Sequence, residues 1–338
     1  MTRKTATIFL EYQPYIEASP VTKNDLYAQA CSNDRITIDS WRNTWISQVK
    51  ANHAIYGSFA KKSIGLLFNS LQHKPVILAG SGPSLKKNAH ILKDKNPGIP
   101  IVSCLHNFHF FEDLGIKVDY YVSLDAGPIV IDEISEGGDP SVDYWEKTKG
   151  KTLLCYIGTH PNLLAKWKGD IYFFNAPVPD QQIEAEIDSV ERFKTYVSSG
   201  GNVLGACLYI AKGFLGCGTT IFIGADFAFS DEEKFHAWDS QYDKELGRTI
   251  KLMNIFGYRQ KTWQSYANFK AWFDWVAQTV PGEYINCTEG GIFGAYNEGN
   301  IRAVSQMELA ECLKRFSLSE FLRDQSENPE TKNIQLLF

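Results

Sequence analysis

Residues 80–84, with the sequence GSGPS, form the part of this 338-residue chain whose residue types and spacing best suit chemistry. They follow the apolar run 76–79 directly and precede a helix-like stretch. A buried strand that ends in glycines and opens into a helix presents free backbone N–H groups, which suit an anion such as phosphate. The spacing matches neither the dinucleotide fingerprint nor the P-loop. Because a purely structural strand–turn–helix corner needs the same residues, both interpretations stay open.

Two aspartates and one histidine add candidate chemistry. Asp125 and Asp226 each follow an apolar run that predicts a strand, and a carboxylate there can bind a ribose hydroxyl or a divalent cation. Equally, each can cap a turn or accept bonds from nearby backbone N–H groups. His236 lies in a polar stretch ten residues after Asp226. A loop histidine near a sheet edge can act as a general acid or base, although most loop histidines are plain surface residues.

A second corner rich in glycine and hydroxyl groups lies at residues 198–202, with the sequence SSGGN, before a run of small residues. It offers either another anion or sugar contact or simply close packing of a helix on a sheet. His106 and His109 flank Asn107, but no third metal ligand lies nearby, so we interpret them as local packing or ligand contacts rather than a zinc site. The aromatic stretch 263–276 predicts core packing.

The elements that position these residues alternate between strand and helix. The predicted strands are residues 76–79, 100–104, 118–124, 152–157, 171–174 and 220–223. The predicted helices among them are residues 84–95, 107–114, 161–167 and 201–215. Such alternation predicts an α/β fold with a mostly parallel sheet covered by helices on both faces, whose ligands lie beyond the carboxyl ends of the strands. The glycine run, the corner at residues 104–107, Asp125 and Asp226 all fall at such ends, and this convergence predicts a site.

Flanking segments complete the predicted organisation. Residues 1–38 are expected to be irregular, and residues 40–67 helical with Ser40 as the N-cap. After Asp226, we expect a flexible acidic loop at 230–247, a helix at 262–279, a last strand at 283–286 and a helix at 303–323. The predicted units are therefore a largely helical extension at 1–70, a nucleotide-binding domain at 71–300, and C-terminal helices and tail at 301–338.

Composition limits the class of protein. A hydrophobic content of 44% supports a sizeable core, and a net charge of −5 argues against a protein that coats nucleic acid. Seven scattered cysteines, without a C-x-x-C pair, predict reduced and mostly buried thiols, and hence a cytoplasmic protein. The N-terminus lacks the apolar region of a signal peptide, and no apolar stretch is long enough to span a membrane.

Five motifs, in chain order, together resemble a known superfamily: VILAGSGPSL, SLDAGP, SSGGNVLGACLYIA, IFIGADFAFSDEEKFHA and INCTEGGIFGA. They resemble the Maf (motility-associated factor) glycosyltransferases and, equally, the MptE-like 6-hydroxymethylpterin diphosphokinases, over roughly residues 40–300. The segment around Asn107 and residues 111–113 is also similar to the nucleotide corner of bacterial lipooligosaccharide sialyltransferases. The resemblance implies a Rossmann-like, GT-A-type nucleotide fold.

The resemblance also implies an activity: transfer of a nonulosonic, sialic-acid-like sugar from a CMP-activated donor to a hydroxyl of a protein or glycan. No metal or other cofactor is implied to be required. His236 would be the general base and Asp226 would orient the site. Donor or nucleotide contacts would come from Gly80, Ser81, Gly82, Pro83, Ser84, Asn107, Asp125, Ser199, Gly200, Gly201, Asn202, Glu289, Gly290 and Gly291.

Two alternatives stay open. The first is an ATP- and Mg²⁺-dependent pterin diphosphokinase in which Asp125 holds the metal. The second is a non-catalytic nucleotide-binding or assembly protein. Dependence of turnover on a metal separates the first from a glycosyltransferase, and substitution of His236 separates an enzyme from a binding module.

Overall fold

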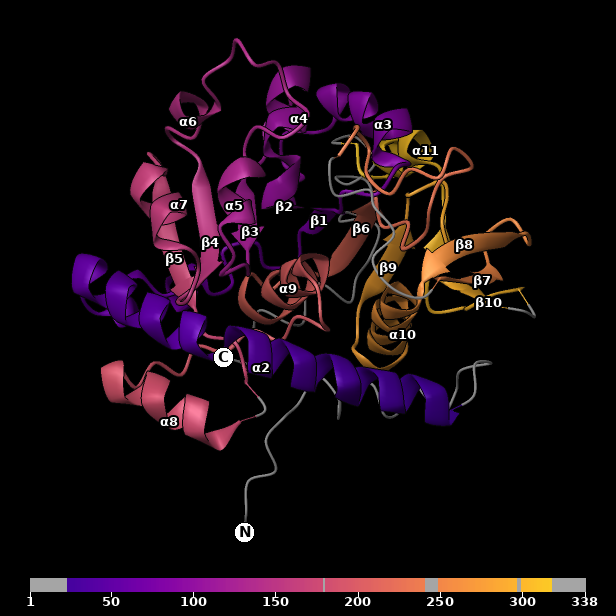
Figure 1. Cartoon of the computed structure of the whole chain (residues 1–338). Helices are drawn as coiled ribbons and strands as arrows, with labels where there is room; N and C mark the ends of the chain where they lie inside the picture. The colour runs from indigo at the N-terminus through magenta and orange to yellow at the C-terminus, as the bar shows by residue number, and fades with distance from the viewer. Residues whose placement is uncertain (1–22, 179, 241–248, 297–298, 318–338) are drawn as a thin grey trace, which may run out of the picture.

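The computed structural model describes residues 23–178, 180–240, 249–296 and 299–317, and Figure 1 shows their arrangement. A central parallel sheet of eight strands has the order β12-β9-β6-β1-β2-β3-β4-β5. Its strands are β1 Pro75–Ala79, β2 Ile101–Cys104, β3 Tyr120–Ser123, β4 Thr152–Tyr156, β5 Asp170–Phe174, β6 Thr219–Ile223, β9 Glu283–Asn286 and β12 Ser305–Gln306. The parallel α/β class is confirmed, and each strand predicted from the sequence is present to within a few residues.

The strand order reverses between β1 and β6. Strands β1 to β5 follow one another across the sheet, after which the chain returns to place β6 on the free side of β1. Residues Pro75 to Ala79 pair in parallel register with Thr219 to Ile223. At such a reversal the loops that leave the two strands diverge to opposite faces and open a crevice, which is the usual ligand site of these sheets. The glycine run and Asp226 follow the two strands that border this crevice.

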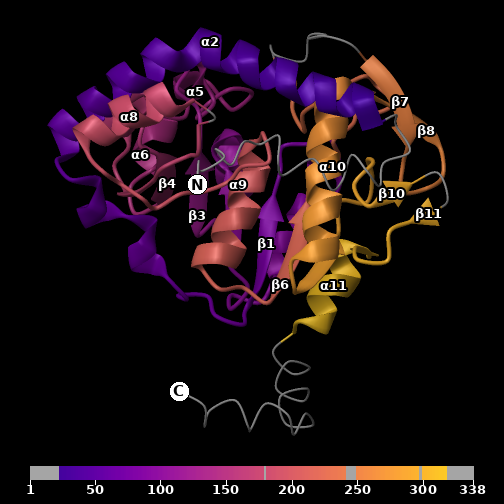
Figure 2. The ribbon, with the colours of Figure 1, turned by 90° about the horizontal axis from the view of Figure 1, so that it is seen from below.

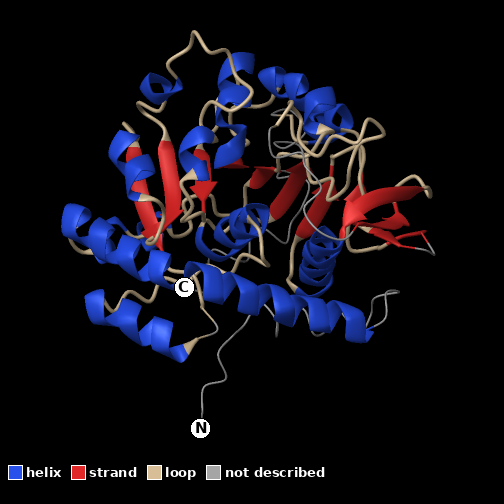
Figure 3. Cartoon of the chain, viewed as in Figure 1, coloured by secondary structure: helices blue, strands red, loops and turns tan. Residues whose placement is uncertain are grey.

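Helices surround the sheet, as Figure 3 shows. Apart from the first helix, the α-helices of the described residues are α3 Leu85–Asn88, α4 Phe108–Leu114, α5 Ile129–Asp132, α6 Tyr144–Lys147, α7 Pro161–Lys166, α8 Gln181–Val190, α9 Val203–Tyr209, α10 Gln264–Thr279 and α11 Leu309–Arg315. Helix α9 packs on β1, β2 and β3, and Figure 2 shows α9 and α10 flanking β1 and β6. Because crossovers between parallel strands are right-handed, helices from before and after the strand reversal cover opposite faces.

The first described helix, α2 Lys23–Tyr56, corrects the sequence-based expectation. The segment 23–38 is helical rather than irregular, and Ser40 lies inside the helix rather than at its N-cap. The apolar periodicity that begins at Trp41 marks only the packed part of the helix, since Arg35, Ile36 and Thr37 are exposed. Residues 1–22 lie outside the described part of the chain.

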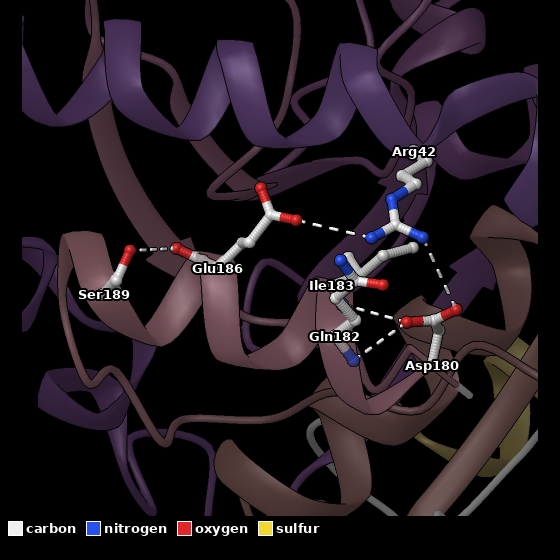
Figure 4. Close-up of polar contacts among 6 residues, drawn as sticks. All are labelled: Arg42, Asp180, Gln182, Ile183, Glu186 and Ser189. Atoms are coloured by element: carbon white, nitrogen blue, oxygen red, sulfur yellow. Dashed lines mark hydrogen bonds and ion pairs between the residues drawn. The ribbon is translucent and has the colours of Figure 1, made fainter.

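Helix α2 packs against α7, α8 and α10 and reaches the loops that follow two strands. The Gln48 side chain donates to the carbonyl of Ala126 over 2.8 Å, and Asn52 Nδ2 donates to the carbonyls of Ile157 and Thr159. Further along, Arg42 lies 3.3 Å from Glu186 on α8 (Figure 4). These contacts attach the helix to the loops after β3 and β4, so the extension supports the edge of the sheet where ligands are expected.

Figure 4 also shows how α8 begins. The Asp180 carboxylate accepts bonds from the backbone N–H groups of Gln182 and Ile183, each over 2.9 Å, which is a standard aspartate N-cap. The same carboxylate lies 3.9 Å from Arg42. One arginine therefore links the cap and the body of α8 to the long helix.

The C-terminal third departs most from expectation. A hairpin of β7 Thr249–Met253 and β8 Arg259–Trp263 precedes α10, so residues 262–263 belong to a strand and not to the predicted helix. Residues 241–247 of the predicted acidic loop lie outside the described part. The predicted helix 303–323 is shorter, because Ser305–Gln306 forms β12 and α11 ends at Arg315; residues 318–338 are not described. Since β12 pairs with β9, the sheet continues past the predicted boundary at residue 300.

None of the described helices, including the 34-residue α2, combines the length and the apolarity that crossing a bilayer requires.

Candidate functional site

A cavity of about 270 Å³ lies at the carboxyl ends of β1, β2, β3 and β6, where the sequence predicted a site. Its wall is formed by the loops that leave these strands, by the N-terminal end of α9 and by one side of α10. The polar and charged side chains of the wall, together with the aromatic ones, are Ser81, His106, Ser123, Asp125, Glu133, Asn202, Asp226, Phe227, Phe235, His236, Tyr266 and Phe269.

The glycine run packs against the loop after β6 rather than lying open. Gly82 N–H donates to the carbonyl of Gly224 over 2.9 Å, and Gly80 N–H donates to the carbonyl of Ile223. A Cβ atom on Gly80 would lie 2.5 Å from the Gly224 oxygen, which explains why only glycine fits there. These backbone donors, predicted to hold a phosphate, are therefore already paired within the protein.

Asp226 is the acidic group at the centre of this corner. Its carboxylate accepts a 2.7 Å bond from Ser84 Oγ and longer 3.3 Å contacts from Ser84 N–H. The residue is 5% exposed, and this burial raises the pKa of the carboxyl to about 6, against the opposing effects of the Ser84 bonds and of Lys87. The carboxyl of Asp226, which lies between the loops after β1 and β6, can therefore exchange a proton at a pH close to neutral.

Two further acidic residues, Asp125 and Glu133, also line the cavity. Asp125 follows β3, as predicted, and Glu133 lies just beyond α5. Burial, opposed by His106 and reinforced by Asp125, raises the pKa of Glu133 to about 7. Burial also raises the pKa of Asp125, and His106 again acts in the opposite direction. Two interacting carboxyls that resist ionisation together are available to share a proton, a hydrogen-bond donor or a cation.

His236 is held close to the cavity by an aromatic and polar cluster. Its ring lies 4.9 Å from the ring of His106, edge to face, and is stacked on Trp238 at 5.8 Å. His106 Nε2 lies 2.6 Å from a carboxylate oxygen of Glu136, whose other oxygen accepts a 2.8 Å bond from Ser240 Oγ. Glu136 therefore connects the histidine on the β2 side to the loop that carries His236.

A larger groove of about 940 Å³ adjoins the cavity. It is bordered by Pro83, Ser84 and α3 on one side and by the β7–β8 hairpin on the other, with Gly290 and Gly291 between them. Among the described residues, only Asp226 and His236 line both the cavity and the groove. The two residues proposed from the sequence as the catalytic pair therefore lie where the two compartments meet.

Other predicted site residues are placed as follows. Gly80, Ser81, Gly82, Asp125, Gly201 and Asn202 line the cavity, and Pro83, Ser84, Gly290 and Gly291 line the groove. Asn107, Ser199, Gly200 and Glu289 line neither of the two.

Each of these four has a structural contact instead. The Asn107 amide donates to the carbonyls of Ala79 and Gly80, each over 3.1 Å, and is fully buried. Glu289 accepts bonds from the side chain of Asn88 and from the backbone of α11. Ser199 accepts a bond from Gly201 N–H, and Gly200 has a φ of +54° with no room for a side chain beside Trp272. These residues shape the loops around the site without bordering it.

Sequence reasoning missed Glu133, Glu136 and the whole β7–β8 wall. Glu133 and Glu136 stand in the segment IDEISEGG, whose acidic residues look like an ordinary solvated surface. The one signal in the sequence is that this group of acidic residues follows Asp125 by only about ten positions. His106 was interpreted as packing or a ligand contact, and it does line the cavity, whereas His109 is buried and burial lowers its pKa to about 4.

Within the described residues, no group of three or more histidine, cysteine, aspartate and glutamate side chains is placed to hold a metal ion. Asp125 and Glu133 both line the cavity, but together they supply only two candidate metal ligands.

We expect Gly82→Ala to disrupt this corner. A Cβ atom at residue 82 would lie 2.1 Å from Asp226 Oδ2 and 2.7 Å from the Gly224 oxygen, so the two loops must separate. Such overpacking should lower the free energy of unfolding by about 1–3 kcal/mol or more. Urea denaturation measures the loss, with Gly213→Ala as the matched control because its nearest neighbour lies at 3.5 Å. Equal stability of the two variants would contradict this geometry.

Comparisons with known proteins address the fold and the family. Among solved structures, the structure of a Maf glycosyltransferase from Magnetospirillum magneticum AMB-1 is similar, with a TM-score of 0.54 and 15% identity. The match covers 75% of this chain but only 37% of that one, and it concerns the fold. No curated protein matches the sequence. The family model for 6-hydroxymethylpterin diphosphokinase MptE-like proteins matches residues 52–232, more than half of the chain. The chain therefore belongs to the MptE-like family.

Proposed function

We propose that this protein is a glycosyltransferase that moves a nonulosonic sugar from a CMP-activated donor to an acceptor hydroxyl, with Asp226 and His236 at the reaction centre. The observation that supports this most is the position of these two residues between the cavity and the groove. Two substrates must bring their reacting atoms together in a transfer reaction. A pair of proton-exchanging side chains at the junction of two compartments suits that requirement.

The cavity suits the nucleoside part of the donor. Asp125 and Glu133 offer carboxyl oxygens that can accept bonds from ribose hydroxyls and from the exocyclic amine of cytosine. Phe235, Tyr266 and Phe269 supply an aromatic wall for a flat ring. The location at the strand reversal is also where parallel sheets of this type commonly bind nucleotides.

The chemical step follows from these positions. The acceptor oxygen attacks the anomeric carbon, the bond from that carbon to the phosphate oxygen breaks, and CMP leaves with the electron pair. His236 takes the proton of the acceptor hydroxyl, which a positioned histidine can do near neutral pH. The Asp226 carboxyl, held by Ser84, orients the groups around it and can exchange a proton at pH values near its pKa of about 6.

One observation favours the diphosphokinase as a second candidate. Asp125 and Glu133 line the cavity together, and no lysine or arginine is among its described lining residues. Magnesium is commonly bound by one or two carboxylates together with substrate phosphates, so this pair fits Mg²⁺. In that case Asp125 and Glu133 would hold the metal, which would neutralise charge on the phosphates of ATP. Binding to a pterin would use the same aromatic wall.

The proposed setting is cytoplasmic, and the proposed partners are a nucleotide-sugar donor and a protein or glycan acceptor. In support, the six cysteines that the structure describes in full are free and buried, which suits a reducing compartment.

A series of nucleotides tested by thermal shift separates the candidates. We expect CMP and CMP-linked nonulosonic sugars to raise the melting temperature more than ATP with Mg²⁺ does, because a ligand that binds only the folded state stabilises it. Turnover of the CMP-sugar, followed as release of CMP, should persist in EDTA. If ATP–Mg²⁺ is the best stabiliser and EDTA abolishes turnover, the diphosphokinase replaces the glycosyltransferase. If ligands bind but no turnover is found with either substrate class, a binding module is the better conclusion.

A further inference from the structure

The β7–β8 hairpin sorts its charges onto one face. In its antiparallel register Lys251 stands opposite Lys261, and Met253 stands opposite Arg259. Because side chains alternate along a strand, Lys251, Arg259 and Lys261 share a face, and all three line the groove. On the alternate positions, Thr262 lies outside the groove lining and its side chain donates to the carbonyl of Phe227. Gln260 also borders the groove, and its side chain donates to the carbonyl of Phe229.

This arrangement places like charges beside one another, and only one of them is compensated by an ion pair in the described part of the chain. Lysines directly opposite each other on a hairpin destabilise it. Lys261 has a partner in Glu233 at 3.3 Å, but within the described part of the chain Lys251 and Arg259 form no ion pair. Both side chains line the groove, so they remain available to an anion that binds there.

The opposite wall of the groove is also cationic. Lys86 and Lys87 come from α3, immediately after the glycine run, and both side chains are exposed. They too form no ion pair among the described residues, although Lys87 acts to lower the pKa of Asp226 and Lys86 that of Asp239. Within the part of the chain that the structure describes, the groove therefore has four unpaired cations, Lys86, Lys87, Lys251 and Arg259, against three acids without an ion pair, Asp226, Asp231 and Glu232.

The cavity has the reverse character. Its described lining contains Asp125, Glu133 and Asp226 but no lysine or arginine. His106, which also lines the cavity, is hydrogen-bonded to Glu136. The N–H groups of Gly80, Gly82 and Ser84 are used within the protein. An anion in the cavity would therefore meet mainly negative charge and few free donors, whereas the groove offers it cations on two walls.

We propose that the groove, and not the glycine run, binds the anionic groups of the activated substrate, with Lys86 and Lys87 on one side and Lys251 and Arg259 on the other. This inference rests on the proposed function, because it assumes a substrate that carries phosphate. The nucleoside lies in the cavity and the phosphate lies in the groove, beside its lysines and Arg259. The part of the ligand that joins them passes between the two compartments at Asp226 and His236. For a nonulosonic donor the carboxylate of the sugar is a second anionic group that the groove accommodates.

Calorimetric titration with three probes tests the assignment: cytidine, CMP and inorganic tripolyphosphate. The variant is Lys251→Gln/Arg259→Gln, and the matched control is Lys93→Gln/Lys149→Gln, which removes two exposed lysines that line neither compartment. In the groove variant we expect the dissociation constants of CMP and tripolyphosphate to rise roughly fivefold or more, with cytidine changed less than about twofold. The control should bind all three as the unmodified protein does. All four positions are exposed, so folding should be unaffected.

The outcomes separate this inference from the proposed function. If CMP binds the groove variant as tightly as the unmodified protein, the phosphate lies elsewhere and the inference is wrong, while nucleotide binding stands. If tripolyphosphate binds, and binds more weakly to the groove variant, while cytidine does not bind and CMP binds no more tightly than tripolyphosphate, the groove is an anion site but the proposal of a CMP-linked donor is wrong. If ATP, titrated in addition to the three probes, binds with a lower dissociation constant than tripolyphosphate and CMP, the groove holds a nucleoside triphosphate, as the diphosphokinase requires. Failure of all probes to bind overturns both proposals.

Discussion

Replacement of His236 by alanine is expected to lower the rate of sugar transfer by about two to four orders of magnitude, the usual contribution of a general base. The reason is geometric: the ring borders both compartments and is held in place by contacts with His106 and Trp238. Nucleotide binding should survive, because Asp125, Glu133 and the groove lysines remain. Release of CMP measures the rate, and the thermal shift with CMP measures binding.

The matched control for this substitution is His90→Ala, because His90 is an exposed histidine that lines neither compartment. It should leave the transfer rate unchanged. A transfer rate for His236→Ala within about threefold of the control would mean that another group removes the acceptor proton, since loss of a general base should produce a far larger change. Asp226 would then be the residue to test.

Replacement of Asp226 by asparagine should stabilise the protein above pH 6 while lowering transfer by about two orders of magnitude. Burial raises the pKa of Asp226 from 3.8 to about 6, so the folded state holds its proton more tightly than the unfolded state. Stability from this group is therefore present at low pH and is lost as pH rises through 6. The loss approaches about 3 kcal/mol, because one pKa unit corresponds to 1.36 kcal/mol.

Asparagine avoids this loss because its amide is neutral and its oxygen can still accept the bonds from Ser84. The gain in free energy of unfolding should be absent near pH 4, grow up to pH 6 and stay constant above it. Urea denaturation at several pH values measures it, and the same series on Asp231→Asn provides an exposed aspartate of the groove as control. A difference from the unmodified protein that does not vary with pH would show that Asp226 is not held near its pKa of about 6.

Much of the central fold could be predicted because the strands are short apolar runs that end in glycine or polar residues. The run before Gly80 and the run before Gly224 predict two buried parallel strands, and in the structure these two are neighbours. That pairing brings Gly82 and Asp226 together. The site at the carboxyl ends of the strands followed from the class of fold alone.

The remaining parts could not be predicted, for physical reasons. The β7–β8 hairpin has a polar groove face, so residues such as Lys251 and Arg259 hide the apolar alternation that marks a strand. Glu133 matters only because the fold brings it near Asp125 at the cavity and partly removes it from solvent, and neither can be read from spacing. The glycine run resembles an anion cradle, but in the structure Gly80 and Gly82 donate to the carbonyls of Ile223 and Gly224, which lie far away in the sequence. Ser84 donates to the Asp226 carboxylate.

The most direct test of the account is a crystal structure of the protein with CMP bound. We expect the cytidine in the cavity at the carboxyl ends of β1, β2, β3 and β6, with its polar groups near Asp125 and Glu133, and the phosphate beyond Asp226 and His236, facing Lys86 and Lys87. A nucleotide bound with its phosphate on the backbone of residues 80–84, or at a surface away from both compartments, would contradict the account.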